Sequence, residues 1–393
     1  MELREYREGD LEALTRLGVL AFGGSVSDWE GHFLPEKNPR LDPEQVHVIE
    51  DDGEVRASAT ALPLESFVDG EPRPMGGIAA VMAHPAYRRR GYAGDLMRAV
   101  LRDLRERGVS LSLLSPFSHA YYRSFGYELV TEAIEYTLSP TDLPTSPEQR
   151  HLRAYREEDL PRMMSLLERE AASHPLCVRR GEAHWRQTIA HKDCEAAVYE
   201  GEGGVVEGYL LYKMSGWSEG REPPRRLQVE ELIAGTRGAR EALISFLGAL
   251  DPETFRVGHW TSRGEPLHPY LQSSFVNAKI KPDQMLRLID VEAALGFLDR
   301  ATDEPLVLEV ADDVIPENAG RYTVGGEGVV RGAEASETVA LDVRQLAQLY
   351  AGYLPAQGLA RRGLVEPVSE RALELLEALF PVGDPWLFGP DHF

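Results

Sequence analysis

Cysteine is scarce in this sequence, and a long apolar run is missing altogether. The 393 residues include two cysteines, Cys177 and Cys194, which cannot form a disulfide framework. Nowhere do about 18 apolar residues follow one another, and the first residues lack the apolar stretch of a secretion signal. We therefore expect a cytoplasmic protein that is kept reduced and has no segment that enters a membrane.

Positive charge is the second shortage. Lysine and arginine contribute 42 residues against 64 aspartates and glutamates, so the formal net charge is −22. Such a charge repels nucleic acids and anionic lipid surfaces, which we exclude as partners. It could attract cationic substrates such as amines, although a general role in solubility explains it equally well. Because no cysteines and histidines have the spacing of a zinc site, no metal is predicted.

The rest of the composition is that of an ordinary folded protein. Hydrophobic residues make up 43% of the chain and charged residues 27%, which excludes a fibrous or mostly disordered chain. The length is roughly two and a half times the ~150 residues typical of one domain. Two or three domains are therefore expected.

An internal repeat divides the first two thirds of the chain. Residues 3–11 and 152–160 share seven of nine amino acids, at an offset of 149. At nearly the same offset, residues 47–55 and 197–205 both have the pattern of a strand–turn–strand hairpin. Two matches at almost one offset indicate a duplicated domain of about 140 residues.

The first copy is expected to alternate strands and helices. Asp10 stands where an N-cap would precede a helix, as Asp159 does in the second copy. Apolar residues at helical spacing predict a helix over about 91–107 that stops at Gly108. The expected strands cover residues 45–50, 54–68, 75–83 and 109–115.

Three domains follow from this organisation: 1–147, 148–284 and 285–393. The third region differs from the two copies and indicates a small α+β domain. Its last residues, 385–393, are unusually apolar for a free terminus, so we expect them to pack against the protein. The expected elements of this region are strands 305–310 and 321–324, a turn at 325–328, and helices near 343–350 and 370–380.

The segment 81–94 has the pattern of a phosphate-binding turn. A strand ends before Pro85, a basic turn follows, and a helix opens on small residues. Backbone N–H groups and the positive end of a helix dipole would meet at one point, which suits a pyrophosphate. Gly91 and Ala93 leave room for phosphate oxygens there. Positive charge would come from Arg88, Arg89 and Arg90.

This pattern, Arg-x-x-Gly-x-Ala between a strand and a helix, resembles motif A of the GNAT superfamily of N-acetyltransferases. Residues 121–127, Tyr-Tyr-Arg-Ser-Phe-Gly-Tyr, resemble a second signature of these enzymes. With the duplication and the third small domain, the whole chain resembles acetyltransferases of the enhanced intracellular survival (Eis) type. The resemblance implies a mixed α+β fold with tandem GNAT domains and a C-terminal sterol carrier protein-like domain. It also implies a hexamer.

The resemblance further implies which residues bind the cosubstrate acetyl-CoA. They lie at the end of strand 75–83, in the basic turn and helix start, and just after strand 109–115: Val81, Met82, Ala83, Arg88, Arg89, Arg90, Gly91, Tyr92, Ala93, Gly94, Phe117 and Ser118. In the second copy the basic turn falls on 238–241, Gly-Ala-Arg-Glu. A carboxylate where phosphate should approach predicts that this copy does not bind coenzyme A.

Transfer of an acetyl group to an amine needs three things: a neutral amine, a donor to the developing oxyanion and an acid for the thiolate. Backbone N–H groups at the end of strand 75–83 are the expected oxyanion donors. Tyr122 is the expected acid, because a phenol of pKa ~10 is protonated at neutral pH. By resemblance, Phe393 is the base through its terminal carboxylate, and His392 is a rival base.

The acceptor is the least determined part. The resemblance implies a multi-amine small molecule, aminoglycoside-like, bound near the acidic and aromatic segment 28–33, although a surface helix explains that segment equally well. One alternative is transfer to a lysine or N-terminus of a protein or peptide. Another is a non-enzymatic acyl-CoA- or lipid-binding protein.

Overall fold

The computed structural model describes residues 1–191, 194–215, 225–250, 256–300, 302–325 and 328–393. The chain divides into two compact units. Unit 1 comprises residues 1–131, 283–383 and Phe393. Unit 2 comprises residues 132–282 and 384–392.

The first sheet of unit 1 has seven strands in the order β1-β2-β3-β4-β5-β14-β6. Only β4 and β5 run parallel to each other, and every other neighbouring pair is antiparallel. The strands are β1 Glu2–Glu5, β2 Val46–Asp51, β3 Glu54–Val68, β4 Glu71–Ala83, β5 Leu111–Leu114, β14 Met285–Leu288 and β6 Glu128–Leu129.

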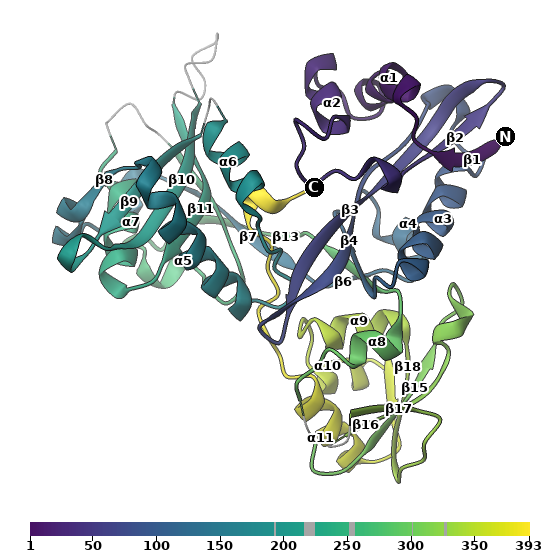
Figure 1. The fold of residues 1–393 in the computed structure, drawn as a ribbon. Helices are drawn as coiled ribbons and strands as arrows, with labels where there is room; N and C mark the ends of the chain where they lie inside the picture. Colours follow the sequence, from purple (N-terminus) through teal and green to yellow (C-terminus); the bar gives the residue numbers. More distant parts are fainter. Residues whose placement is uncertain (192–193, 216–224, 251–255, 301, 326–327) are drawn as a thin grey trace. The chain divides into compact units, whose positions relative to one another are not determined.

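Helices cover both faces of this sheet (Figure 1): α1 Leu11–Phe22, α2 Val26–Phe33, α3 Tyr92–Glu106 and α4 His119–Arg123. The expected helix over 91–107 is confirmed as α3, because Leu96, Val100 and Leu104 recur at helical spacing and are buried. Leu104 packs on Gly76 of β4, where a Cβ would lie 2.6 Å from it. Gly108 ends the helix with φ 74°, a left-handed conformation that favours glycine.

Unit 2 repeats this architecture, with the strand order β13-β7-β12-β11-β10-β9-β8 and one parallel pair, β11 with β12. Its strands are β7 Glu132–Leu138, β8 Leu152–Ala154, β9 Glu195–Glu200, β10 Val206–Ser215, β11 Arg226–Ala234, β12 Arg256–Thr261 and β13 Asn277–Pro282. Its helices are α5 Leu160–Ser173, α6 Glu182–Ala190 and α7 Arg237–Gly248. Both expected hairpins are present, as β2–β3 and β9–β10.

Two strands lie in the sheet of the other copy. Strand β7 follows the first copy in sequence but pairs with β12 and β13 of unit 2. Strand β14 follows the second copy but pairs with β5 and β6 of unit 1. A division by chain order, at 147/148 and 284/285, does not anticipate this exchange.

The duplicated opening carries the same ion pair twice. Asp10 accepts hydrogen bonds from Arg4 at 2.7 and 2.8 Å and from the Arg7 backbone N–H at 2.7 Å. Asp159 bonds Arg153 with the same two distances. The prediction that these aspartates cap the following helices is wrong, because neither side chain makes a cap bond to α1 or α5. Each carboxylate is occupied by an arginine instead.

The last region of unit 1 has a five-stranded sheet in the order β17-β16-β15-β18-β19. The expected strands and helices of this region are confirmed, and the middle of the turn expected at 325–328 lies outside the described residues. The strands are β15 Leu306–Ala311, β16 Gly320–Gly325, β17 Gly328–Arg331, β18 Glu337–Asp342 and β19 Val365–Pro367. The helices are α8 Val291–Leu295, α9 Val343–Tyr350, α10 Ala356–Ala360 and α11 Glu370–Leu379.

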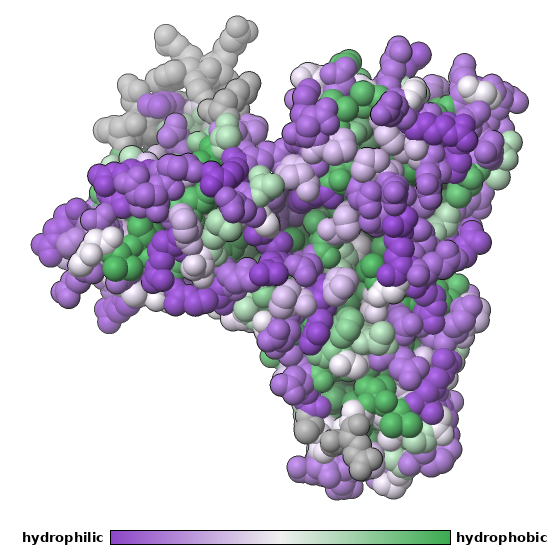
Figure 2. All heavy atoms as spheres, viewed as in Figure 1, coloured by the Kyte–Doolittle hydropathy of each residue, from purple (hydrophilic) through white to green (hydrophobic). Residues whose placement is uncertain are grey.

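The visible surface of each part carries mainly hydrophilic side chains, with apolar ones scattered among them (Figure 2). Within the described ranges, no helix has the length and hydrophobicity needed to cross a membrane.

Candidate active site

Strands β4 and β5 of unit 1 separate at a defined point. Their parallel pairing ends with Ile78 opposite Leu114, while β4 continues to Ala83. On its other edge β4 has a bulge, since Ala79 pairs with Thr60 but Met82 pairs with Ser58. Within the bulge Ala80 has φ 50°, which turns the backbone out of the regular ladder. Within the described ranges, the separation leaves backbone N–H groups at the end of β4 without a ladder partner on the β5 side, where the oxyanion donors are expected.

The three expected acetyl-CoA residues of this strand follow the point of separation. Met82 is buried, and Val81 and Ala83 pack against the core beneath α3. They therefore line an edge of β4 that has no ladder partner in the described part of the chain beyond Ile78.

The basic turn has the backbone of an anion-binding loop. Arg89 and Gly91 have φ 65° and 91°, and Gly91 is the N-cap of α3 without any side-chain cap bond. The first N–H groups of α3, from Tyr92 to Gly94, are therefore not covered by a capping side chain. An uncapped start of a 15-residue helix beside arginines fits a pyrophosphate.

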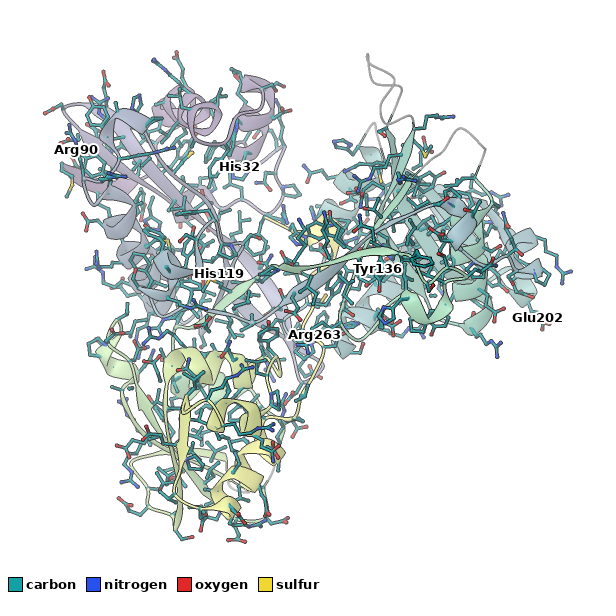
Figure 3. All side chains as sticks on the ribbon, turned by 180° about the vertical axis from the view of Figure 1, so that it is seen from behind. His32, Arg90, His119, Tyr136, Glu202 and Arg263 are labelled. Carbon is teal, nitrogen blue, oxygen red and sulfur yellow. The ribbon has the colours of Figure 1, made fainter. Side chains whose placement is uncertain are left out.

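Side chains of the turn are held in different ways. Arg90 stacks on the ring of Tyr87 at 4.6 Å, and Arg56 of β3 stacks on the same ring at 4.0 Å. Figure 3 shows Arg90 in unit 1, at the turn before α3. Tyr92 donates from its hydroxyl to Asp51 at 2.6 Å. The remaining two arginines of the turn, Arg88 and Arg89, are exposed.

Helix α4 follows β5 and carries the expected acid. Ser118 caps this helix, because its hydroxyl accepts a hydrogen bond from the Tyr121 backbone N–H at 3.3 Å. Phe117, 70% exposed, has its ring 5.3 Å from that of Tyr122. Figure 3 places His119 at the beginning of this helix. The structure thus brings these two expected coenzyme A contacts next to Tyr122.

Tyr122 is 3% exposed and sits among aromatic rings. The rings of Tyr121 and Tyr127 lie 5.1 and 6.1 Å away. Burial, and to a smaller extent these two neighbours, raises the pKa of Tyr122 well above its ordinary value of 10.0. The hydroxyl therefore carries its proton throughout the neutral range. The hydroxyl of the neighbouring Tyr121 is buried and has no hydrogen-bond partner among the described residues.

The glycine of the second motif has two structural reasons. Gly126 has φ 80°, which favours glycine, and a Cβ on it would lie 2.7 Å from Cζ of the buried Arg287. Arg287 belongs to β14 and donates to Asp312 at 2.6 Å. Tyr127, the last residue of the motif, shares a 2.7 Å hydrogen bond with Ser112 of β5. The motif therefore fixes α4 against β5 and β14.

The C-terminal residue, Phe393, packs on strand β4. A Cβ on Gly77 would lie 3.0 Å from its ring and 2.8 Å from Leu64 of β3. Gly77 pairs with Leu113, one position before the pairing of β4 and β5 ends. The preceding glycine of β4 faces α3, so Phe393 lies on the opposite face of the sheet from α3. His392, the rival base, has Nδ1 3.2 Å from the backbone oxygens of Phe388 and Gly389.

In unit 2, residues 238–241, which the repeat offset aligns with the basic turn, lie inside α7 and not before it. Thr236 caps this helix by accepting from the Ala239 backbone N–H at 3.3 Å. Glu241 pairs with Arg237 at 2.7 Å. A capped helix start with its own carboxylate does not offer the open anion site of unit 1.

The aromatic segment 28–33 forms α2 and packs on α1. The ring of Trp29 lies against Gly18, where a Cβ would be 2.2 Å from it, and stacks on Phe22 at 5.5 Å. Burial, and then the charge of Arg40, lowers the pKa of His32 to about 4. This ring lies within the α2 region in Figure 3.

Some residues around the site carry no recognisable sequence signal. Arg56 stacks on Tyr87 from a neighbouring strand, and Arg287 stacks on Gly126 from a position far along the chain. The bulge at Ala80 could not be recognised from its residue type, because alanine is not typical of bulges. Of these features, only the contact of Arg287 had a signal in the sequence, namely the glycine of the Phe-Gly-Tyr motif, Gly126.

Known domain families match three parts of the chain. Residues 2–130 and 176–288 match acetyltransferase (GNAT) domains, and residues 291–388 match a sterol carrier protein domain. An uncharacterized N-acetyltransferase of Streptomyces avermitilis is 27% identical over 365 residues, covering 87% of both chains. One of Streptomyces coelicolor is 27% identical over 420 residues, covering 98% of both.

Solved structures share the fold over the whole chain. A GCN5-related N-acetyltransferase from Anabaena variabilis superposes with a TM-score of 0.87 at 22% identity, covering 100% of both chains. The corresponding enzyme from Kribbella flavida gives 0.83 at 25% identity with the same coverage. Eis1 from Mycobacterium abscessus gives 0.79 at 23% identity, covering 100% of this chain.

These matches agree with the geometry of unit 1, where an uncapped helix start, a separated pair of parallel strands and a buried tyrosine lie together. The resemblance found in the sequence is confirmed. The chain is a GNAT-type N-acetyltransferase with two acetyltransferase-like domains, a sterol carrier protein domain and the fold of Eis-type enzymes.

Proposed function

We propose that this acetyltransferase transfers the acetyl group of acetyl-CoA directly to an amine of a multi-amine, aminoglycoside-like small molecule. The observation that carries the proposal is the position of Phe393, whose ring packs on Gly77 next to the point where β4 and β5 separate. A chain terminus held near this point would bring an ionised carboxylate close to the strand edge, as the proposed base requires.

Acetyltransferases of this fold use acetyl-CoA, and unit 1 fits that molecule. The N–H groups from Tyr92 to Gly94 would hold the pyrophosphate, with Arg88, Arg89 and Arg90 supplying charge. Val81, Met82 and Ala83 would line the arm, with Phe117 and Ser118 opposite them. When bound, acetyl-CoA supplies the acetyl group as a reactive thioester.

The chain itself supplies a proton donor and a proton acceptor. Tyr122 keeps its proton on Oη at neutral pH and is the acid for a departing thiolate. The terminal carboxylate of Phe393 accepts a proton from the acceptor's ammonium group, directly or through water. Backbone N–H groups of β4 beyond Ile78 are the donors for charge that develops on the carbonyl oxygen.

The acceptor class is supported by charge and by likeness. A net charge of −22 favours the approach of cations over anions. The fold is shared with Eis1 from Mycobacterium abscessus, and the Eis-type resemblance implies aminoglycoside-like acceptors. Transfer to a protein lysine or N-terminus is the second candidate, because the same acid and base would serve it.

The test measures thiol release from acetyl-CoA with four acceptors: an aminoglycoside, a linear polyamine, a monoamine and a peptide with one lysine. We expect turnover with the multi-amine acceptors and products that carry more than one acetyl group by mass spectrometry. Tyr122→Phe should lower kcat by roughly a hundredfold to ten-thousandfold, because it removes the general acid. Tyr121→Phe is the matched control, since it removes a neighbouring hydroxyl from the same helix.

Two outcomes would contradict the proposal. A clear preference for the peptide would favour the second candidate. Equal effects of Tyr121→Phe and Tyr122→Phe would remove the acid role of Tyr122.

The hexamer, the cytoplasmic location and the domain limits at 147/148 and 284/285 stay proposals. Light scattering of the purified chain tests the assembly. A stable monomer at working concentration would remove the hexamer.

A further inference from the structure

Unit 2 contains a cavity of about 460 Å³ at the place where its own parallel strands separate. The pairing of β11 and β12 ends with Gln228 opposite Gly258, while β11 continues to Ala234 and β12 to Thr261. Residues of both strands line the cavity, together with α7 and the segment 384–392. All of its lining residues belong to unit 2.

Three buried polar atoms of the lining, in His259, Thr261 and Arg226, lack a hydrogen-bond partner among the described residues. His259 and Thr261 of β12 are 7% and 6% exposed. Nδ1 of His259 and Oγ1 of Thr261 have no hydrogen-bond partner among the described residues. A buried polar atom left unpaired costs about 1–3 kcal/mol, so three in one lining need a physical reason. A bound molecule with polar groups would provide it.

The lining offers more acceptors than donors. Glu230 is contacted by Lys213 at 3.0 Å, and Glu135 by Lys281 at 3.4 Å. Both lysines are more than a third exposed, and such ion pairs contribute little. A carboxylate can accept about four hydrogen bonds, so each of these glutamates keeps free acceptor positions.

The other charged groups of the lining make contacts within the protein, although Nε of Arg226 has no partner among the described residues. Arg180 neutralises Glu231, and Arg240 pairs with Glu265. Glu170 lies 3.6 Å from His174, whose pKa is raised although burial opposes it. Arg226 donates to Gln228 at 2.8 Å. Glu135 and Glu230 are therefore the carboxylates most open to a further donor.

Aromatic rings also line the cavity. Trp260 is 36% exposed and lines the cavity, as do Trp386 and Phe388. An ammonium group is attracted by the face of an indole ring as well as by carboxylates. Rings and carboxylates together recognise an organic cation better than either does alone.

We propose that this cavity is a second ligand site of the chain, which takes a small organic cation with an ammonium group attached to an apolar or aromatic body. The ammonium group donates to Glu230 and Glu135, and the body packs on Trp260. The site is independent of the acetyl-transfer machinery of unit 1. The start of α7 is capped and offers no phosphate site, and the proposed ligand needs none.

The test uses 2-phenylethylamine, an ammonium ion at pH 7, as the probe on the full chain. Hydrogen–deuterium exchange read by mass spectrometry reports which peptides the probe protects. We expect protection of residues 226–234 and 256–262. The neutral isostere 2-phenylethanol should bind roughly fivefold to thirtyfold more weakly, the range of a desolvated cation–π contact.

Two variants check the site. Trp260→Ala should abolish the protection of 226–234, while thiol release from acetyl-CoA stays unchanged. Phe275→Ala is the matched control, because it removes another exposed aromatic ring of unit 2 that is not part of the lining.

Three results would overturn the proposal: no protection of these strands in the wild type, equal binding of the alcohol, or full protection in Trp260→Ala. Displacement of the probe from these strands by coenzyme A would also reject it, because the site would then belong to the coenzyme.

Discussion

Arg180 holds Asp391 with two hydrogen bonds, both 2.7 Å long, and neither side chain has any exposed surface. The same guanidinium donates to Glu231 from Nη1 at 3.1 Å, and Tyr209 donates to that glutamate at 2.6 Å. Burial raises the pKa of Glu231, while Arg180 opposes that rise. One arginine thus ties the last segment of the chain to unit 2, two residues before Phe393.

Removing this arginine should strongly destabilise unit 2. Arg180→Met leaves two carboxylates buried without a cation, which costs about 3–5 kcal/mol in the free energy of unfolding. Arg179→Met is the control, because Arg179 is 44% exposed and its ion pair with Glu168 contributes at most about 1 kcal/mol. Urea unfolding of both variants measures the difference. Equal midpoints would show that the buried pair has no net role.

Substitution of Gly126 tests the second motif. Gly126→Ala should cost more stability than Gly108→Ala, although both glycines have a left-handed backbone. At Gly108 nothing lies within 4 Å of the added Cβ, so only the backbone strain of about 1–2 kcal/mol is expected. At Gly126 the buried Arg287 must also move. Thermal unfolding compares the two, and equal losses would contradict the close packing of Arg287.

The basic turn should determine the affinity for acetyl-CoA. Arg88→Ala and Arg89→Ala should each raise the KM for acetyl-CoA roughly tenfold to a hundredfold, the range of a hydrogen bond to a charged group, with little change in kcat. The same change at Arg237, at the start of α7 in unit 2, should leave KM unaltered. Steady-state kinetics decide between these results. A similar rise in KM for Arg237→Ala would mean that unit 2 also binds the cosubstrate.

Buried histidines should make the protein less stable in weak acid. The pKa of His32 is about 4 in the folded chain, against an ordinary value of 6.5, mainly because of burial. Between these values the unfolded chain binds a proton that the folded chain does not. Stability is therefore complete above pH ~6.5 and declines as the pH falls toward 4, by at most ~1.4 kcal/mol per pH unit for one group.

Urea midpoints at pH 7.5, 6 and 5 measure this decline. His32→Gln should lessen it, although the lowered pKa values of His259 and His47 keep part of the decline. His191→Gln, a change at an exposed histidine, should leave it unchanged. An unchanged slope in His32→Gln would contradict the burial of that ring.

Local patterns predicted much of the fold. Helix α3 and strands β2 to β5 depend on side chains that are close in sequence, such as Leu96, Val100 and Leu104. The exchange of β7 and β14 was not predictable in this way, because strand pairing joins residues far apart in the chain. The role of Asp10 was predicted wrongly, since an aspartate can serve either as a helix cap or as the partner of an arginine.

In the candidate site, the positions that could be predicted from the sequence are those where a motif determines the backbone conformation. The basic turn and Tyr122 lie where the two motifs placed them, because Gly91 and Gly126 both need left-handed conformations. The clamp of Arg180 on Asp391 has no sequence pattern, as its partners are 211 residues apart. Non-local ion pairs of this kind appear only when the chain is folded.

The terminal carboxylate is the most direct test of the proposed mechanism. One glycine added after Phe393 moves the carboxylate away while keeping the ring on Gly77. The account predicts that kcat falls roughly a hundredfold or more, because a general base is lost, while the KM for acetyl-CoA changes little. Full turnover by the extended chain would contradict it.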